Sequence, residues 1–597
     1  MTRTKLLMGA TALISVSLAL ASGAQAVVTG TVYGGGSTLI GPYLRQAEDC
    51  YGTKNDLVVQ GSAYPYGAGT DTFITEPVFI SGAFNCTVSS TANELFYVNA
   101  GSGNGELMAV THDVDGTKGT PGAVDVGVTS DSGHVQFPSV QYGAGDYGLD
   151  YKETAIYRLG GTLSQTAGNS GTVSLSPGTG GAFTYANPEP LYGNFIQVPL
   201  SIDPVAMAFP SAYAIDNTSG TPVTYHVHIK TPNADGSGGL VMDMKTVCSI
   251  ANGLITNLND PALTALNGGV SLQDTADHTV FSVPISLAGR SDSSGTTSIF
   301  FRALAAQCNS TSSGYTGVNY FTAGGGKKLP AAVRAGGLSP NPFSVFTGST
   351  LVAAYVATPI TVPPVGSETV QFRMAYIGTD YTLPASLHNG LTYGLNVANI
   401  KLSAKVVLEP TAKNALASFG TGLNALLPPQ SDGSGHFTST PAAGSKGHRA
   451  NPEDWAQPIA TTVSYDGGVT FVNTPLADPD HNITGVTKGY PMVGTTNLFM
   501  NTCYNGANET AAMLGFVHYY LTSTTIKTAT TGLLAVSGLG AMPTPWLTAE
   551  NNTFISPSSE PIASRAALQA LNLNILQAGT GPASGTGSQC NAVAPGA

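Results

Sequence analysis

The stretch from Gly289 to Thr297 carries the residue types best suited to gripping an oxyanion. It reads Gly-Arg-Ser-Asp-Ser-Ser-Gly-Thr-Thr after an apolar run, which places it at the end of a strand and the start of a helix. Arg290 can hold two oxygens in a bidentate fork, while Ser294, Gly295 and Thr296 would offer amides and hydroxyls at a helix N-terminus. An arginine beside an acid is usually only a surface ion pair, so these residues alone favour the two interpretations about equally.

Three other short stretches have residues of the same kind. Residues 34–39 form a glycine-rich turn, Gly-Gly-Gly-Ser-Thr-Leu, whose backbone N–H groups could point at an anion. Residues 99–107 contain Ser102 in a second Gly/Ser turn, and the apolar segment 124–131 ends at Asp131. Taken singly, each is as well explained by an ordinary turn or helix cap.

Helical and strand patterns alternate along the chain and would position these stretches. We predict helices at residues 42–51, 245–258, 294–308 and 509–522, and strands at 30–33, 197–209, 281–288 and 497–501. Strands followed by helices indicate an α/β protein with mostly parallel sheets flanked by helices. Segments dominated by Gly, Ser, Thr and Pro are expected to be surface loops or tails: 160–181, 232–239, 309–328, 430–451 and 578–597.

The first residues predict export. Arg3 and Lys5 precede an apolar run over residues 6–21, which ends in Gly23-Ala24-Gln25-Ala26, a pattern suited to a signal peptidase. The apolar run is short for a membrane span of about 20 residues. No cysteine follows it to accept a lipid, so we expect a cleavable signal peptide at 1–26 and a periplasmic or secreted protein.

Composition limits the partners. Only 10% of the 597 residues are charged, and the formal net charge is -12. Nucleic acid is disfavoured as a partner because its phosphate backbone demands a basic surface. One buried anion is still compatible with this charge, since such a site works through local donors.

Six cysteines, an even number, suit an oxidising compartment. Fifteen pairings are possible; the simplest joins neighbours in sequence, namely Cys50 with Cys86, Cys248 with Cys308, and Cys503 with Cys590. A metal site is disfavoured because the sequence has no C-x-x-C and no close Cys/His cluster. We expect no metal and no cofactor.

The four candidate stretches, in this order, resemble the phosphate-specific substrate-binding proteins of bacterial ABC importers, the PstS-like members of the periplasmic binding proteins. That family has a G-x-G-x-T turn, matched by residues 34–38, and a G-S-x-G type turn, matched by residues 101–103. Its D-x-G-x-S-D strand is matched by residues 125–131 with one extra residue, and its R-x-D-x-S-G-T helix start is matched by residues 290–296 in register.

The resemblance implies a type II periplasmic-binding-protein fold, in which two lobes are joined by two hinge strands and enlarged here by loop-rich β insertions. Residues 195–213 would be the first hinge strand and residues 489–504 the returning one. The implied domains are a signal peptide at 1–26, lobe I at 27–205 with an insertion at about 55–94, lobe II at 206–490 with insertions, and a return to lobe I with a C-terminal tail at 491–597.

The resemblance also implies the ligand and its contacts. Inorganic phosphate would bind between the lobes of a monomer, with an ABC permease as a further partner. The implied contacts are Thr38, the Leu39 amide, Ser102, Asp131, Arg290, Ser294, Gly295 and Thr296, with Asp292 holding the Arg290 guanidinium. Asp131 would accept a hydrogen bond from the proton that phosphate, unlike sulfate, still carries.

Two other functional classes of protein stay open. An exported phosphatase would need a nucleophile, a base and often metals, yet the sequence has no G-x-S-x-G and no H-E-x-x-H. His226 and His228 alternate on an expected strand, where an ordinary surface strand is the better explanation. The other class is a secreted protein of the same fold with a scavenging or protein-binding role, which the Gly/Ser/Thr-rich insertions favour.

Overall fold

The protein is described from a computed structural model. The structure describes residues 30–53, 86–99, 101–111, 140–148, 161–163, 183–185, 195–229, 239–276, 283–310, 313–321, 329, 343–362, 370–383, 393–420, 428, 455, 462–464, 470–472, 488–504, 506–529, 531–555 and 576–577. The expected signal peptide at 1–26 and most of the Gly/Ser/Thr-rich segments lie outside these residues.

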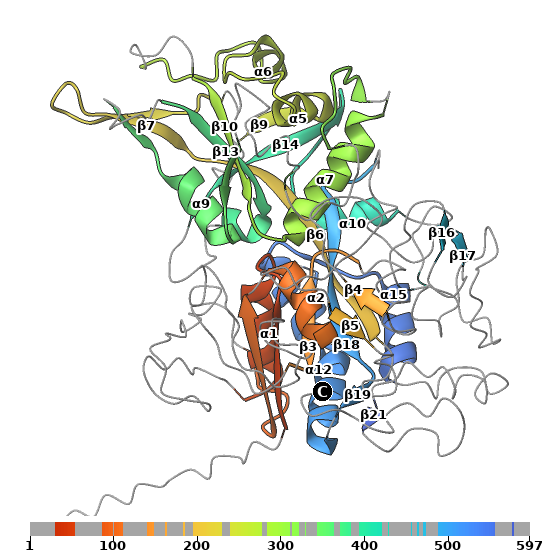
Figure 1. The fold of residues 1–597 in the computed structure, drawn as a ribbon. Coiled ribbons are helices and arrows are strands. Elements are labelled where there is room, and N and C mark those ends of the chain that lie inside the picture. The colour runs from red at the N-terminus through yellow and green to blue at the C-terminus, as the bar shows by residue number, and fades with distance from the viewer. Residues whose placement is uncertain are drawn as a thin grey trace, which may run out of the picture.

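The first lobe is built on a sheet with the strand order β2-β1-β3-β18-β6 (Figure 1). Its parallel part consists of β2 (Asn93–Asn99), β1 (Gly30–Gly36) and β3 (Tyr142–Gly145). All but one residue of β1 are buried, as expected for a parallel strand covered on both faces. The carboxyl ends of β1 and β3 therefore reach the same edge of the sheet.

The second lobe continues the same curled sheet on the other side of β6, in the order β11-β10-β13-β6. The strands β10 (Ile285–Arg290), β11 (Phe343–Phe346) and β13 (Phe372–Gly378) run parallel. β14 (Asn396–Ser403) pairs with β6 and also with β9 (Leu240–Asp243). The predicted two-lobed α/β fold is confirmed; each lobe has a parallel part of the sheet, and the strands that join the lobes make antiparallel pairs.

Two long antiparallel strands connect the lobes. β6 (Phe195–Phe209) is buried over its whole length and pairs with β18 (Val493–Asn501) as far as Pro204. From Val205 onward it pairs with β13 instead, so one strand belongs to both lobes (Figure 1). These strands lie within the segments that the resemblance assigned to the two hinges. The domain boundaries inferred from the sequence remain a proposal.

The four predicted helices form, with one correction. They are α1 (Gly41–Tyr51), α5 (Met244–Ala251), α7 (Gly295–Cys308) and α12 (Ala507–Thr522). The prediction of a helix over 245–258 was wrong in its second half, because α5 ends at Ala251, Asn252 is its C-cap and Gly253 adopts a positive φ of 75°. The strand predicted at 281–288 begins later, at Ile285, since Pro284 has no N–H to donate to a neighbouring strand.

The remaining elements surround the two sheets. In the lobes lie α2 (Ser102–Thr111), α6 (Pro261–Leu266), α9 (Ser349–Ala357), η2 (Thr379–Thr382), β15 (Val406–Leu408), α10 (Ala412–Leu416), η3 (Ala417–Phe419), α13 (Thr524–Lys527), α14 (Leu533–Val536), β20 (Gly540–Ala541), α15 (Thr544–Glu550) and η6 (Asn551–Ile555). Four small sheets are formed by β4 (Gly161–Leu163) with β5 (Phe183–Tyr185), β7 (Ala212–Asp216) with β8 (Val223–His226) and β12 (Ile360–Val362), β16 (Thr462–Ser464) with β17 (Thr470–Val472), and β19 (Cys503–Tyr504) with β21 (Leu576–Gln577).

Disulfides hold both lobes. Cys50 is bonded to Cys86 with a Cα–Cα distance of 5.3 Å, and Cys248 to Cys308 with a distance of 5.6 Å, which confirms two predicted pairs. Cys503 is also disulfide-bonded. Cys590, its predicted partner, lies outside the described residues. Within the part of the chain that is described, no helix is both long and apolar enough to cross a membrane.

Candidate functional site

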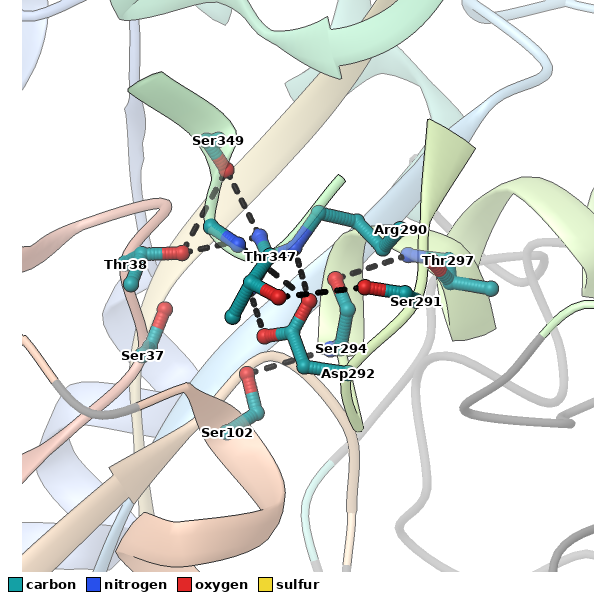
Figure 2. Close-up of polar contacts among 12 residues, drawn as sticks. Ser37, Thr38, Ser102, Arg290, Ser291, Asp292, Ser294, Thr297, Thr347 and Ser349 are labelled. Carbon is teal, nitrogen blue, oxygen red and sulfur yellow. Dashed lines mark hydrogen bonds and ion pairs between the residues drawn. The ribbon is translucent and has the colours of Figure 1, made fainter. Parts of the chain in front are cut away.

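The turn after β1 is the first wall of the site. Gly36 has a φ of 135°, and a Cβ there would lie 2.1 Å from the Ala144 carbonyl oxygen, so only glycine fits. The chain then turns so that the Ser37 hydroxyl accepts hydrogen bonds from the amides of Leu39 (3.1 Å) and Ile40 (3.4 Å) at the start of α1. The Leu39 amide, predicted as a phosphate contact, thus has an internal partner, while the Thr38 hydroxyl lies toward the second lobe (Figure 2).

Ser102 begins α2 and links the two lobes. Its hydroxyl donates to Asp146 Oδ2 at 3.0 Å, while it accepts a hydrogen bond from the Gly295 amide, at the start of α7 in the other lobe, at 3.1 Å. Ser102 is 1% exposed, so this contact between the lobes excludes water. The predicted convergence of Ser102 and Gly295 is present.

Arg290 lies at the centre of the cluster, as Figure 2 shows. The guanidinium makes a bidentate contact with Asp292, in which Nε donates to Oδ1 at 2.7 Å and Nη2 is paired with Oδ2. Its Nη1 donates to the hydroxyls of Thr38 (2.9 Å) and Ser349 (2.7 Å). The predicted supporting role of Asp292 matches this geometry, and Thr38 of the first lobe reaches the arginine of the second.

The start of α7 presents the remaining predicted residues. The Ser294 side chain caps the helix by accepting from the Thr297 amide at 3.4 Å, and its own hydroxyl proton is still available to donate. Thr296 is 2% exposed, and its hydroxyl has no hydrogen-bond partner among the described residues. An unpaired buried hydroxyl is costly, which points to a ligand as its partner.

Four helix N-termini converge here. α2 and α7 meet through Ser102 and Gly295, while the turn before α1 meets α9 through Thr38 and Ser349, whose hydroxyls lie 3.3 Å apart. Each N-terminus carries a partial positive charge from its unpaired amides. The shared space between these helix ends therefore favours an anion.

The carboxylate of the site is Asp146, directly after β3. It accepts hydrogen bonds from the hydroxyls of Ser37, Ser102 (3.0 Å) and Thr496 (2.7 Å). Asp131, which was predicted for this role, lies outside the described residues. Asp146 could have been found from the sequence, because residues 141–146 read Gln-Tyr-Gly-Ala-Gly-Asp and place Gly143 and Asp146 in register with D-x-G-x-S-D, without the extra residue that the 125–131 match needed.

Ser349 is the second residue that sequence reasoning missed. It opens α9 after the turn Thr347-Gly348, so the local pattern is again strand, glycine turn and hydroxyl-bearing helix start. This repeated pattern could have identified Ser349 as a site residue from the sequence. The Gly348 amide also donates to Asp292 Oδ1 at 3.3 Å, so this turn holds the acid that orients Arg290.

The charges in the cluster are set by burial and by Arg290. Burial by itself would raise the pKa of Asp292, but the Arg290 guanidinium outweighs it and holds that pKa below its usual range. Burial raises the pKa of Asp146, opposed by its hydroxyl donors and by Arg290. In the described part of the chain, no group of three or more His, Cys, Asp or Glu residues is placed to hold a metal ion.

Comparisons with known proteins give relatives at low identity. No family model matches the chain. It is 23% identical over 424 residues to a phosphate-binding protein from an unknown prokaryotic organism, covering 71% of this chain and 89% of that protein. It is 26% identical over 333 residues to alkaline phosphatase L of Pseudomonas aeruginosa, covering 55% of this chain and 67% of that protein.

Among solved structures, a high affinity periplasmic phosphate-binding protein with bound phosphate aligns with a TM-score of 0.46 and 19% identity, over 90% of this chain and 97% of that one. The resemblance to phosphate-binding proteins, inferred above from four short motifs, is confirmed by the sequence relatives.

Proposed function

We propose that this chain is an exported binding protein that captures inorganic phosphate between its two lobes. The observation that carries the proposal is the Arg290 cluster, in which one buried arginine, four helix N-termini and one buried carboxylate meet where the lobes touch. The chain's similarity to a phosphate-binding protein over 71% of its length supports the same ligand.

Donors for the phosphate oxygens come from both lobes. Thr38 and Ser102 would supply them from the first lobe, and Arg290, Ser294 and Thr296 from the second. The Leu39 and Gly295 amides would join them by leaving their present partners, Ser37 and Ser102. A dehydrated anion needs a donor for nearly every lone pair, because a buried charge without partners is costly. Ser349, which already shares Nη1 of Arg290, would orient the guanidinium and add a hydroxyl.

Asp146 takes the role that the sequence motif assigned to Asp131. An ionised carboxylate only accepts hydrogen bonds, so it binds an anion well only if that anion carries a proton. Phosphate does so near neutral pH and sulfate does not. Asp146 would therefore select phosphate by repelling the wrong tetrahedral anion.

Closure follows from the same contacts. Direct contacts already cross between the lobes, among them those from Ser102 to Gly295, from Arg290 to Thr38 and from Thr38 to Ser349. Phosphate would bridge these groups and draw the lobes together about β6 and β18, which is the closure motion of periplasmic binding proteins.

The destination of the ligand is proposed from the resemblance. Capture in the periplasm would supply an ABC permease. The alternative is a secreted protein of the same fold that scavenges phosphate or binds another secreted protein outside the cell. Deletion of the chain's gene followed by a phosphate-uptake assay separates these roles, because only the import role predicts slower uptake.

A hydrolytic activity is the second candidate, because one relative is an alkaline phosphatase. We favour binding without catalysis, since the serine hydroxyls that donate to Asp146 also have structural partners. Ser37 accepts hydrogen bonds from the Leu39 and Ile40 amides, and Ser102 accepts one from the Gly295 amide as a contact between the lobes. Hydrolysis of a phosphate monoester by the purified protein, abolished by Ser102→Ala, would instead support a phosphatase.

The binding proposal is tested by calorimetry with phosphate and with sulfate as competitor. The wild-type protein is expected to bind one phosphate and to discriminate against sulfate, while Asp146→Asn, whose amide can donate, should narrow that preference. Asp260→Asn is the matched control, because Asp260 caps α6 of the second lobe and asparagine caps equally well. An unchanged preference in Asp146→Asn would remove Asp146 from the site.

A further inference from the structure

The hydroxyl of Thr496 lies between two buried carboxyl groups. It is within hydrogen-bond distance of Asp146 Oδ1, at 2.7 Å, and of Asp203 Oδ2. Thr496 is on β18 and Asp203 on β6, the two strands that join the lobes. Both are 0% exposed and Asp146 is 1% exposed, so water does not separate these groups.

Counting protons constrains this arrangement. A threonine hydroxyl has one hydrogen and can donate it to only one of the two carboxyl groups. The other contact is a hydrogen bond only if its carboxyl group is protonated and donates to the threonine oxygen. Two ionised carboxylates around one hydroxyl would leave one carboxylate oxygen facing the threonine oxygen with no hydrogen between them, a repulsive contact in a buried site. One of the two acids must therefore carry a proton.

The hydrogen-bond partners of Asp146 and Asp203 indicate which of the two carries the proton. Asp146 also accepts from the hydroxyls of Ser37 and Ser102 and lies in the field of Arg290, all of which favour its ionised form. Asp203 has one further hydroxyl donor, Ser201 at 2.7 Å, and the backbone of Thr496. Burial, and then the charge of Asp146, raises the pKa of Asp203 to about 7.

We propose that Asp203 carries a proton in the phosphate-binding state and, by donating it to Thr496, lets Thr496 donate to Asp146 and keep that carboxylate an ionised acceptor. This inference rests on the proposed function. Asp203 is a positioning residue, because it acts on the ligand only through Thr496 and Asp146. When Asp203 loses its proton to solvent, two carboxylates compete for one hydroxyl and binding weakens.

The other ionisable groups around Asp203 do not account for the proposed pH dependence. Tyr43 on α1 donates to Tyr520 on α12, and burial raises the pKa of both phenols well above the usual value, so both stay neutral. Asp380 on η2 is the remaining acid within electrostatic range; burial raises its pKa well above the usual value, and the charges of Asp146 and Asp203 add to this. Asp380 lies on η2 rather than on the two strands that carry Asp203 and Thr496, so Asp380→Asn is the matched control.

The experiment compares phosphate affinity from pH 5.5 to pH 8.5 in the wild-type protein and in Asp203→Asn, whose amide donates to Thr496 at every pH. The ionisation of phosphate itself affects both proteins equally and cancels in the ratio of their dissociation constants. If the bound state needs a proton on a group of pKa about 7, the wild type should lose about tenfold relative to Asp203→Asn at pH 8 and almost nothing at pH 5.5.

Two further variants keep the proposal falsifiable if Asp203→Asn does not fold. Thr496→Ser retains the hydroxyl and should keep the wild-type dependence of phosphate affinity on pH. Thr496→Val removes the hydroxyl, and its affinity should change with pH only as the ionisation of phosphate itself requires. Asp380→Asn should behave as the wild type.

A ratio of the wild-type and Asp203→Asn dissociation constants that stays constant across the pH range would overturn the role of Asp203. So would a loss of the wild-type pH dependence in Asp380→Asn instead of in Asp203→Asn. Either result would leave phosphate capture standing. A wild-type protein that does not bind phosphate even at pH 5.5 would overturn the proposed function, and this role of Asp203 with it.

Discussion

Gly295 is the position where one added methyl group tests closure of the lobes. A Cβ at this residue, at the start of α7, would lie 2.5 Å from the Asp146 Cβ and 2.7 Å from its amide nitrogen. Asp146 belongs to the other lobe and its backbone cannot yield as a flexible side chain would. Gly295→Ala should therefore hold the lobes apart by about 1 Å or more, since ordinary carbon contacts lie at about 3.5–4.0 Å.

The magnitude follows from the contacts that this separation breaks. The bond from the Gly295 amide to Ser102 is already 3.1 Å long, and the bond from Arg290 to Thr38 is 2.9 Å long. Losing one neutral hydrogen bond and one to a charged group costs about 3 kcal/mol, or roughly 100-fold in the dissociation constant of phosphate. Titration calorimetry measures the affinity, and small-angle scattering measures whether phosphate still makes the protein more compact.

The control separates closure from stability. Gly269→Ala, also in the second lobe, places its Cβ in open space but at a φ of 76°, so it should lower the free energy of unfolding without changing affinity. A dissociation constant for Gly295→Ala within threefold of the wild type would show that the anion binds without the lobes meeting at α7, contrary to this prediction.

Three further predictions test other parts of the account. Arg290→Ala should weaken phosphate binding by at least about 1.5–3 kcal/mol, the scale of hydrogen bonds to a charged group, and calorimetry showing unchanged binding would exclude Arg290 from the site. Burial raises the pKa of Glu48 to about 8, so the folded state holds a proton that the unfolded chain releases above pH 4.5. The associated stability is present below pH 4.5 and is lost as the pH rises to about 8, by roughly 3–6 kcal/mol. Urea unfolding at pH 5 and pH 8 should thus show a smaller difference in Glu48→Gln than in the wild type; an equal difference would mean that Glu48 does not titrate in this range. Replacing both Cys248 and Cys308 by serine opens a loop of 60 residues and should lower the free energy of unfolding by about 4 kcal/mol, while a loss below about 1 kcal/mol would show that packing alone holds α5 to α7.

Local patterns in the sequence were enough to place most of the site. The Arg-x-Asp-x-Ser-Gly-Thr segment combines a strand end, an N-cap and a helix start, and each is decided by neighbouring residues. Asp292 accordingly contacts Arg290 and Ser294 caps α7, while the phosphate contacts of Arg290 and Ser294 stay a prediction. The helix α1 and the strand β6 were predicted nearly to their ends for the same reason.

The long-range pairings were not available from local pattern. Asp146 meets Thr496 across 350 residues and Thr38 meets Ser349 across 311, and only the curled sheet brings these pairs together. Asp131 was predicted from the resemblance of residues 125–131 to D-x-G-x-S-D, and because it lies outside the described residues its role stays a prediction. The place of Asp146 follows from the pairing of β3 with β1 and β18, and the sequence of a single strand contains no such information.

The end of α5 shows a different limit. Ile255 and Leu258 continue the helical spacing of apolar residues and are buried, but they reach the core from the chain beyond Gly253 rather than from the helix. A periodic apolar pattern indicates which residues are buried, but it does not determine where the helix ends. Here the left-handed conformation of Gly253 ends the helix.

A crystal structure of the protein grown with phosphate would show where the anion binds. A tetrahedral anion is expected between the lobes, with oxygens within hydrogen-bond distance of the Arg290 guanidinium, the Gly295 amide and the Asp146 carboxylate. Phosphate bound at another surface, with the Arg290 guanidinium still held by Asp292, Thr38 and Ser349, would contradict this expectation.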